Sequence, residues 1–180
     1  MRVGAVMIAA ALALGAAGGA KAGVRIFSYD PADEATRRVA GDLTFEFDQR
    51  LVFTTILRIR STQGQAAADL KPAEEHVLGR GGLSRLIGKA AQERDLYEVQ
   101  PAEEGSDLIR AFCPGSKRAW LAFSRLVEDK PLRVQVIGDD PAGGPTRLCE
   151  TLEFTFHGEW RLPPGPPVQA GDMLVPSFPY

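Results

Sequence analysis

Two neighbouring runs of alternating apolar and polar residues, 43–48 and 51–60, constrain the fold of this chain most strongly. Alternation with a period of two is typical of β-strands that bury one face. The polar residues 48–50 between the runs predict a hairpin connection. The apolar positions that share a face are Leu43, Phe45 and Phe47 in the first run, and Leu51, Phe53, Thr55, Leu57 and Ile59 in the second.

Further strand-like segments occupy the rest of the chain. A first short strand is expected over 24–29. The second half is rich in such segments, and Gly, Pro, Asp and Ser clusters separate them. Because the connections are short, the strands are expected to pair antiparallel. The expected strands are 96–99, 107–113, 118–127, 132–137 and 148–156, with His157-Gly158 turning the chain into a last stretch over 159–162.

Helical signals are fewer. Asp33 is a plausible N-cap for a short helix through Ala40. The apolar stripe of Leu83, Leu86 and Ile87 predicts one main helix over about 83–94. Residues 63–75 are polar and Ala-rich and are interpreted as a loop that contains at most one helical turn. The expected class is α+β: a single antiparallel, curved sheet of about six to eight strands, with the main helix packed on it.

The first 22 residues have the three parts of a secretory signal peptide. Arg2 precedes an uncharged run over 3–17, and small residues follow it. Cleavage is expected before Gly23, with a cut before Lys21 as the alternative. The apolar run is shorter than the ~20 residues that span a bilayer, so no transmembrane segment is expected after cleavage. The remaining chain divides into one domain, 23–162, and a Pro-rich extended or disordered tail, 163–180.

Charge and composition narrow the functional classes. The chain has 21 Lys and Arg against 23 Asp and Glu. Loss of Arg2 and Lys21 with the signal peptide takes the net charge from −2 to about −4. A mildly acidic chain without basic clusters is not expected to bind nucleic acid. The preference for Arg, Ala and Gly favours a GC-rich bacterial source, and with the signal it indicates a periplasmic or secreted protein.

The chain has two cysteines, Cys113 and Cys149. An even pair in an oxidising compartment predicts a disulfide, which would close a loop of about 36 residues. Neither cysteine belongs to a CxxC motif. A metal site or a catalytic thiol is the alternative.

Catalytic and metal-binding motifs are scarce. His76 and His157 are the two histidines, and no GxSxG motif is present. His157 with Glu159 is the candidate pair for a hydrolase that acts on envelope material. His76, with Glu74 and Glu75, lies in a polar segment, and no metal or other cofactor is indicated by the ligand spacing.

Two loops have weaker binding signals. Glycines that precede the main helix could cradle an anion with their backbone N–H groups, and Arg80 and Arg85 would add charge to Gly81 and Gly82. The alternative is that the glycines only start the helix. Asp139-Asp140 could ligate Ca²⁺, but the EF-hand spacing is absent, and an acidic turn is the simpler interpretation.

A large aromatic set on the strands is either the core or the lining of an apolar pocket. The preferred hypothesis is a small, exported, non-catalytic protein that binds a ligand or assists envelope assembly, its partner an apolar ligand or an envelope protein. The alternatives are the periplasmic hydrolase and a purely structural interaction domain. The aromatic set is Phe45, Phe47, Phe53, Trp120, Phe154 and Phe156.

Overall fold

The structure is a computed structural model and describes residues 24–50, 53–89, 91–102 and 104–161. The predicted signal peptide, its two cleavage positions and the Pro-rich tail lie outside these residues. In the described part, no helix is both long enough and apolar enough to cross a membrane.

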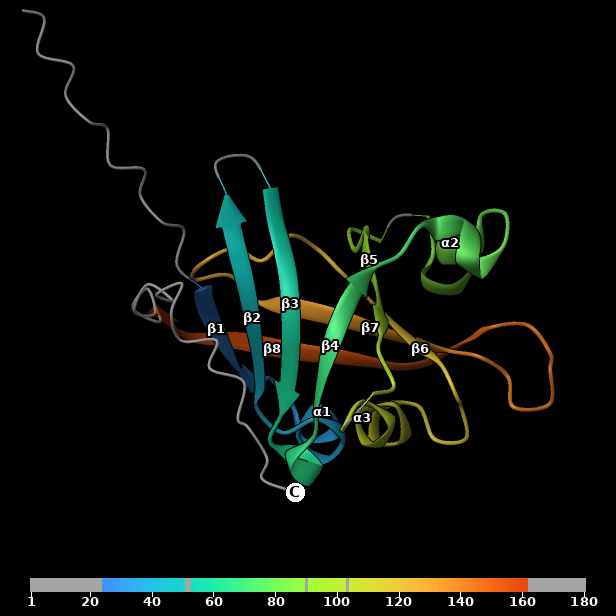
Figure 1. Cartoon of the computed structure of the whole chain (residues 1–180), viewed down its shortest axis with the longest axis horizontal. Helices are drawn as coiled ribbons and strands as arrows, with labels where there is room; N and C mark the ends of the chain where they lie inside the picture. The colour runs from blue at the N-terminus through green and yellow to red at the C-terminus, as the bar shows by residue number, and fades with distance from the viewer. Residues whose placement is uncertain (1–23, 51–52, 90, 103, 162–180) are drawn as a thin grey trace, which may run out of the picture.

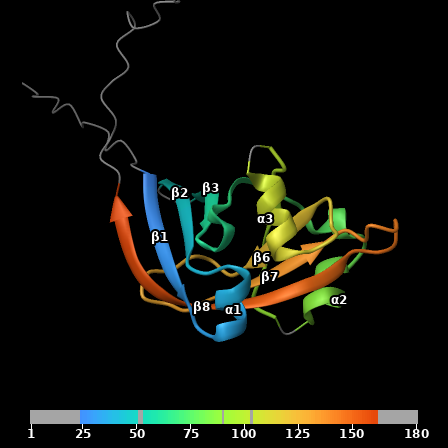
Figure 2. The ribbon, with the colours of Figure 1, turned by 90° about the horizontal axis from the view of Figure 1, so that it is seen from below.

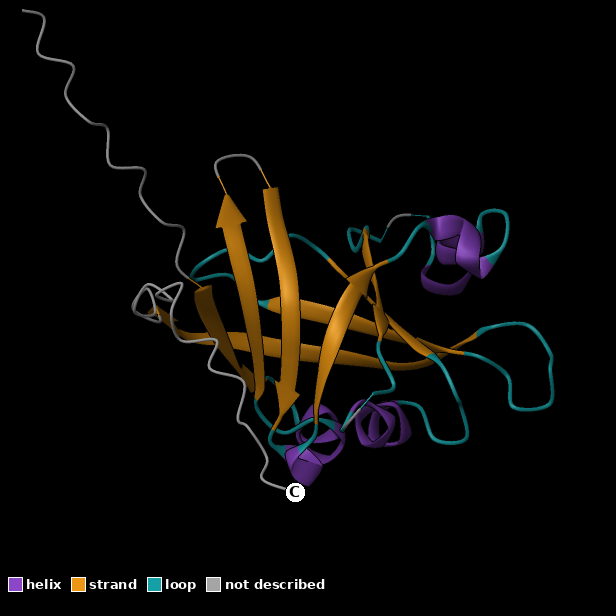
Figure 3. Cartoon of the chain, in the orientation of Figure 1, coloured by secondary structure: helices purple, strands orange, loops and turns teal. Residues whose placement is uncertain are grey.

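The strands form a closed antiparallel barrel in which each strand pairs with its neighbours along the chain and the last strand pairs with the first. Figures 1 and 3 show this continuous wall of strands. The strands are β1 (Val24–Pro31), β2 (Leu43–Arg50), β3 (Phe53–Ser61), β4 (Ala67–Pro72), β5 (Asp95–Val99), β6 (Ala119–Phe123), β7 (Leu132–Gly138) and β8 (Arg147–Arg161).

This barrel contradicts the expected open sheet with one main helix packed on it. The helices are short and lie at one end or outside the wall (Figure 3). The sheet buries its apolar face against itself by closing, so it needs no covering helix. The helices are α1 (Glu34–Val39), α2 (Gly82–Ile87) and α3 (Gly105–Phe112), with 3₁₀ turns η1 (Gln63–Gln65) and η2 (Glu75–Leu78).

The expected helix over 83–94 is wrong in length, because it ends at Ile87. Gly88 follows with a φ of 87°, a backbone conformation that breaks the helix and that glycine adopts without strain. The stripe of Leu83, Leu86 and Ile87 is nevertheless used, since these side chains pack in an apolar cluster outside the barrel. α1 agrees with its signal: Asp33 caps it by accepting a hydrogen bond from the Thr36 N–H at 2.7 Å.

Three other expectations about elements are also wrong. The segment 107–113 is helical, because its buried residues Leu108, Ile109 and Phe112 are spaced for a helix face rather than alternating. Within the expected loop over 63–75 lies strand β4, in which small alanines made the apolar pattern weak. The expected turn at 157–158 is absent, because β8 continues through it to Arg161.

Strand β8 closes the barrel. It is 15 residues long, pairs with β7 from Arg147 to Phe154, and pairs with β1 from Phe154 to Arg161. Each half carries a β-bulge, which leaves Cys149 and His157 without a directly opposite partner. Bulges of this kind increase strand curvature and twist. They allow one strand to bend far enough to join both edges of the sheet.

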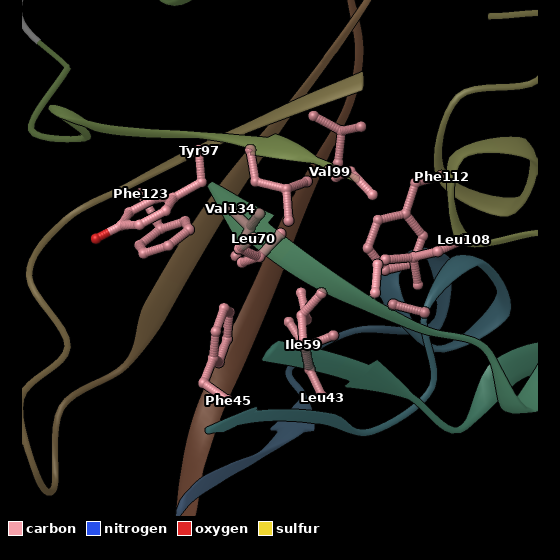
Figure 4. Packing of buried hydrophobic residues seen from close by; sticks show 14 of the residues in the cluster. Leu43, Phe45, Ile59, Leu70, Tyr97, Val99, Leu108, Phe112, Phe123 and Val134 are labelled. Atoms are coloured by element: carbon pink, nitrogen blue, oxygen red, sulfur yellow. The ribbon is translucent and has the colours of Figure 1, made fainter. Parts of the chain in front are cut away.

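The lumen is filled by side chains that form one continuous core (Figure 4). Its aromatic rings pack edge-to-face or stacked: Phe45 lies 6.0 Å from Tyr29 and 5.4 Å from Phe123 between ring centroids, and Tyr97 stacks on Phe123 at 5.1 Å. α3 inserts Leu108 into the same cluster. Figure 2 shows α1 and α3 at this end of the barrel, which they close.

A second, smaller core lies outside the wall. Trp120 and Leu96 face away from the lumen and are covered by α2 and η2 through Leu83 and Leu78. In Figure 1 this helical segment stands beside β5, away from the lumen. The main helix of the sequence-based prediction therefore protects the outer face of the barrel.

The Cys113–Cys149 disulfide, predicted from the sequence, is present. It joins the end of α3 to the bulge of β8, with 5.3 Å between the Cα atoms, and so attaches the helix that closes the barrel to the strand that completes it. Gly138 lies beneath it: a Cβ there would overlap the sulfur atoms of both cysteines. The glycine leaves the space that the bond occupies.

Phe45→Ala is expected to lower the free energy of unfolding by about 3–5 kcal/mol, because it leaves a cavity among packed rings in the lumen. Trp160→Ala is the control, since Trp160 lies on the same barrel but is 49% exposed. Its cost is expected to be less than about 1 kcal/mol. Urea unfolding followed by circular dichroism measures both. Equal costs would contradict a packed lumen.

Candidate functional site

A cavity of about 360 Å³ lies on the outside of the barrel, near the point where β8 passes from β7 to β1. Its volume is at the small end of the range of ligand sites. We refer to it as the Glu93 cavity. Its lining residues are Ala32, Gln92, Glu93, Ser124, Pro131, Leu132, Arg133, Glu153, Phe154 and Thr155.

The strand register fixes the charged wall of this cavity. Val134 on β7 and Leu152 on β8 belong to the lumen core. Successive side chains of a strand point to opposite faces, so the adjacent Arg133 and Glu153 point outward. The two residues are directly opposite one another in the β7–β8 ladder. Their ion pair therefore lies on the outer face of the barrel.

The connection before β5 supplies the other wall. The backbone N–H of Arg94 donates to the Phe123 carbonyl at 3.2 Å, and its guanidinium donates to the Lys89 carbonyl at 3.1 Å. These bonds hold the connection against the end of β6. They position Glu93 with Oε1 4.0 Å from Nη1 of Arg133.

Glu93 is the unusual residue of the site. Its side chain is only 5% exposed, although it is a carboxylate on the outside of the barrel. Oε2 is buried and has no hydrogen-bond partner among the described residues. Leaving a buried polar atom unpaired costs about 1–3 kcal/mol, and more when the group is charged. The carboxylate of Glu93 is therefore held beside the cavity in an energetically costly state.

Arg133 does not donate a hydrogen bond to the carboxylate of Glu93. Its Nε and Nη2 both donate to Oε1 of Glu153, at 3.0 and 2.8 Å. Only the longer 4.0 Å contact remains for Glu93. One guanidinium therefore lies between two carboxylates, and the cavity has an excess of one negative charge.

The candidate catalytic pair does not converge. His157 occupies the β8 bulge on the outer face, 54% exposed, with Nδ1 2.9 Å from Oδ2 of Asp30 and its ring stacked on Trp160. Glu159 is directly opposite Phe27, whose ring is in the lumen core, so its side chain points inward. The barrel wall separates the two side chains.

Glu159 is held by an ion pair at the end of the barrel opposite α3. Arg25 donates from Nε to Oε1 at 2.7 Å and from Nη2 to Oε2 at 2.8 Å, and Arg161 also donates to Oε1 at 2.9 Å. The bonds from Arg25 lower the pKa of Glu159 to about 2, and the same bonds raise the pKa of Arg25. A carboxylate held in this ionised state is poorly suited to general acid–base catalysis near neutral pH.

Arg25 also contacts aromatic rings. Its guanidinium carbon lies 5.1 Å from the ring centroid of Phe27 and 5.5 Å from that of Phe47. Both distances are within the range of cation–π attraction. The cluster of Arg25, Glu159 and two phenyl rings closes the aromatic core at this end as a saturated structural network.

The expected anion site has a structural explanation. α2 has only six residues, and its N-cap Gly81 is in the left-handed region with a φ of 59°. A Cβ on Gly82 would overlap the Cβ of Leu78, so glycine permits η2 and α2 to pack closely. Arg80 and Arg85 are exposed on this segment.

The acidic turn at Asp139-Asp140 also binds its own backbone. Oδ1 of Asp139 accepts the N–H groups of Lys117 and Arg118 at 2.8 and 3.0 Å. Partial burial opposes ionisation, but these backbone bonds outweigh it and lower the pKa of Asp139. Asp140 accepts the Ala142 N–H at 2.9 Å. These carboxylate oxygens therefore accept backbone hydrogen bonds that stabilise the turn.

Over the described residues, no group of three or more His, Cys, Asp and Glu side chains is arranged to hold a metal ion. His76 lies on the surface, with Nδ1 2.8 Å from Oε2 of Glu74 and 76% of its side chain exposed.

The aromatic set divides between several places. Phe45, Phe47 and Phe154 lie in the lumen core, and Phe156 packs at its margin. Trp120 lies in the outer cluster, with Arg118 stacked over it at 4.7 Å. The side chain of Phe53 is outside the described part of the structure.

The residues of the Glu93 cavity were not predicted from the sequence. Glu93, Arg133 and Glu153 come from three segments far apart in the chain, and no motif links them. The signal in the sequence that could have indicated this site is a charged residue, Arg133 or Glu153, within each of two apolar strands. A charged residue of this kind is by itself typical of a solvated strand face. Comparison of the chain with protein-family models, with curated proteins and with solved structures finds no match.

Glu159→Gln is expected to lower stability at neutral pH and to flatten its acid dependence. The folded-state pKa of about 2 is below the unfolded-state value of about 4.5. The ion pair therefore stabilises the fold above pH ~4.5, and this contribution, at most ~3 kcal/mol, is lost as the pH falls towards 2. Chemical denaturation between pH 2 and 7 measures it.

Glu74→Gln is the control for this measurement, because the Glu74 side chain is 82% exposed. Its stability profile should match that of the unmodified protein. A Glu159→Gln profile that also matches it would show that the pair with Arg25 does not stabilise the barrel.

Proposed function

We propose that this protein is a non-catalytic binding module that acts outside the cytoplasm and holds a small ligand in the Glu93 cavity. The observation that carries the proposal is Glu93, which lines a cavity of ligand size although its side chain is only 5% exposed and its Oε2 has no hydrogen-bond partner in the described structure. Ligand sites typically combine apolar walls with a few fixed polar groups. This cavity combines the apolar residues Ala32 and Pro131 with the side chains of Glu93, Arg133 and Glu153.

The location outside the cytoplasm is supported by two features. The Cys113–Cys149 disulfide is typical of oxidising compartments. The first 22 residues have the pattern of a signal peptide. The periplasm or the external medium of a bacterium is the compartment that fits both features.

A binding role is supported over hydrolysis by the geometry of the candidate pair. Nucleophilic hydrolysis requires a base and an orienting acid within hydrogen-bond reach of a nucleophile. His157 and Glu159 point to opposite sides of the wall, and Glu159 is already engaged by Arg25. The Glu93 cavity instead offers fixed recognition groups beside an apolar wall.

The position of the site outside the lumen follows from the filled barrel. An eight-stranded barrel has room either for side chains or for one small ligand. Here large rings, including Phe27, Phe45 and Phe123, are buried in the lumen. The lumen core leaves the outer wall as the surface that can bind a ligand.

Native mass spectrometry of the unreduced protein, purified from a periplasm, tests the proposal. Extra mass that leaves on denaturation is expected for the unmodified protein. Ser124→Phe should abolish it, because the ring would occupy the cavity. Ser84→Phe is the control: it adds the same side chain on α2, outside the cavity lining.

Ligand retention by the Ser124→Phe protein equal to that of the Ser84→Phe protein would contradict this site. If no mass is retained, a thermal-shift screen of small molecules on the same three proteins decides the question. Stabilisation that Ser124→Phe abolishes would support the proposal, and its absence across the screen would contradict it.

A further inference from the structure

We infer that the ligand is a compact organic cation, with an ammonium group that pairs with the carboxylate of Glu93. This inference rests on the proposed function, because it names the chemistry of the ligand in the same cavity.

The charge balance favours a cation. The charged side chains that line the cavity are Glu93, Glu153 and Arg133. Both short bonds of Arg133 go to Glu153, so its charge is already matched. Glu93 contributes the unmatched negative charge. A buried carboxylate without a matched partner is costly, and a bound cation would remove that cost.

Hydrogen bonding leads to the same class of ligand. Oε2 of Glu93 is an acceptor with no donor among the described residues. An ammonium has three donors and no acceptor, so it complements a carboxylate. Ser124 and Gln92 also line the cavity, and their side-chain oxygens are acceptors of the kind that the remaining donors require.

An anionic ligand fits poorly. The one cationic group in the lining is Arg133, and Glu153 occupies its Nε and Nη2. An anion would have to displace Glu153 while lying near the Glu93 carboxylate. Like charges at this range repel, which disfavours anions by charge as well as by geometry.

A metal ion is also disfavoured. Calcium takes six to eight oxygen ligands, with several carboxylates or carbonyls arranged around it. The described residues contain no cluster of three acidic, His or Cys side chains suited to a metal. The cavity is also larger than one ion or one water molecule requires.

The apolar wall explains why the cation should be organic. Ala32 and Pro131 line the cavity, whereas the side chains of Leu132 and Phe154 belong to the lumen core. A short hydrocarbon chain attached to the ammonium would bury apolar surface against Ala32 and Pro131. The site therefore fits a ligand with one cationic end and one apolar end.

Three probes of similar size and different charge test the inference on the full protein. These are n-butylammonium, butyrate and 1-pentanol, each followed by ¹⁵N NMR. Butylammonium is expected to give saturable shifts at the amides of Gln92, Glu93 and Arg133. Butyrate and 1-pentanol should give none at the same concentrations and ionic strength.

Two variants identify the group that is responsible. Glu93→Gln keeps the shape but removes the charge, and should weaken butylammonium binding by at least about 10-fold. Glu98→Gln removes one negative charge from a residue outside the cavity lining that pairs with Arg118. It should change binding by less than about twofold, because distant charges are screened.

The outcomes separate this inference from the proposed function. Equal binding of butyrate or 1-pentanol at these amides would overturn the cationic ligand while leaving a binding cavity. Saturable shifts with CaCl₂ at the same amides, at concentrations where butylammonium gives none, would replace the organic cation with a metal ion. Butylammonium shifts that Glu93→Gln leaves unchanged would also overturn the cationic ligand. If none of the probes binds and native mass spectrometry detects no retained ligand, both the cationic ligand and the binding function are contradicted.

Discussion

The pairing of one long strand with both edges of the sheet is the constraint on which the rest of this structure depends. β8 joins β7 through its first half and β1 through its second, and the two pairings meet at Phe154. Closure removes the open edges that an eight-stranded sheet would otherwise expose. It also turns the apolar face of every strand inward, so the aromatic residues become a filled lumen.

Closure also determines where chemistry can occur. The bulge at His157 shifts the side-chain alternation of β8, which leaves His157 on the outer face and Glu159 inside the barrel. Glu159 then pairs with Arg25 and stabilises that end, while α3 and its disulfide close the other. Both ends and the lumen are used for packing, and a cavity lies at the junction where β8 changes partners, lined in part by Glu93.

The sequence predicted local elements better than their assembly. The alternation in 43–60 correctly indicated a hairpin, and Asp33 correctly indicated the start of α1, because both signals depend on neighbouring residues. The connection expected at 48–50 was wrong, because β2 continues to Arg50, which pairs with Phe53. A bulge in this ladder also buries Ile56 and leaves Leu57, expected on the buried face, 41% exposed. The closed barrel was not predicted, since closure depends on pairing between Arg25 and Arg161, at opposite ends of the described chain. β4 was missed because Ala67 and Ala68 bury little apolar surface. The Glu93 cavity was missed for a similar reason, as its charged residues meet only after closure.

Hydrogen exchange of the backbone amides is the most direct test of this account. In a closed barrel, the amides of β1 and of residues 156–161 that point across the β1–β8 ladder are hydrogen-bonded and should exchange as slowly as the paired amides of β6 and β7. The measurement is made residue by residue by NMR under native conditions. Slow exchange in both ladders is the predicted result. Fast exchange confined to these amides of β1 and the second half of β8 would show an open sheet with two free edges, and would contradict the closure on which the site and its proposed ligand depend.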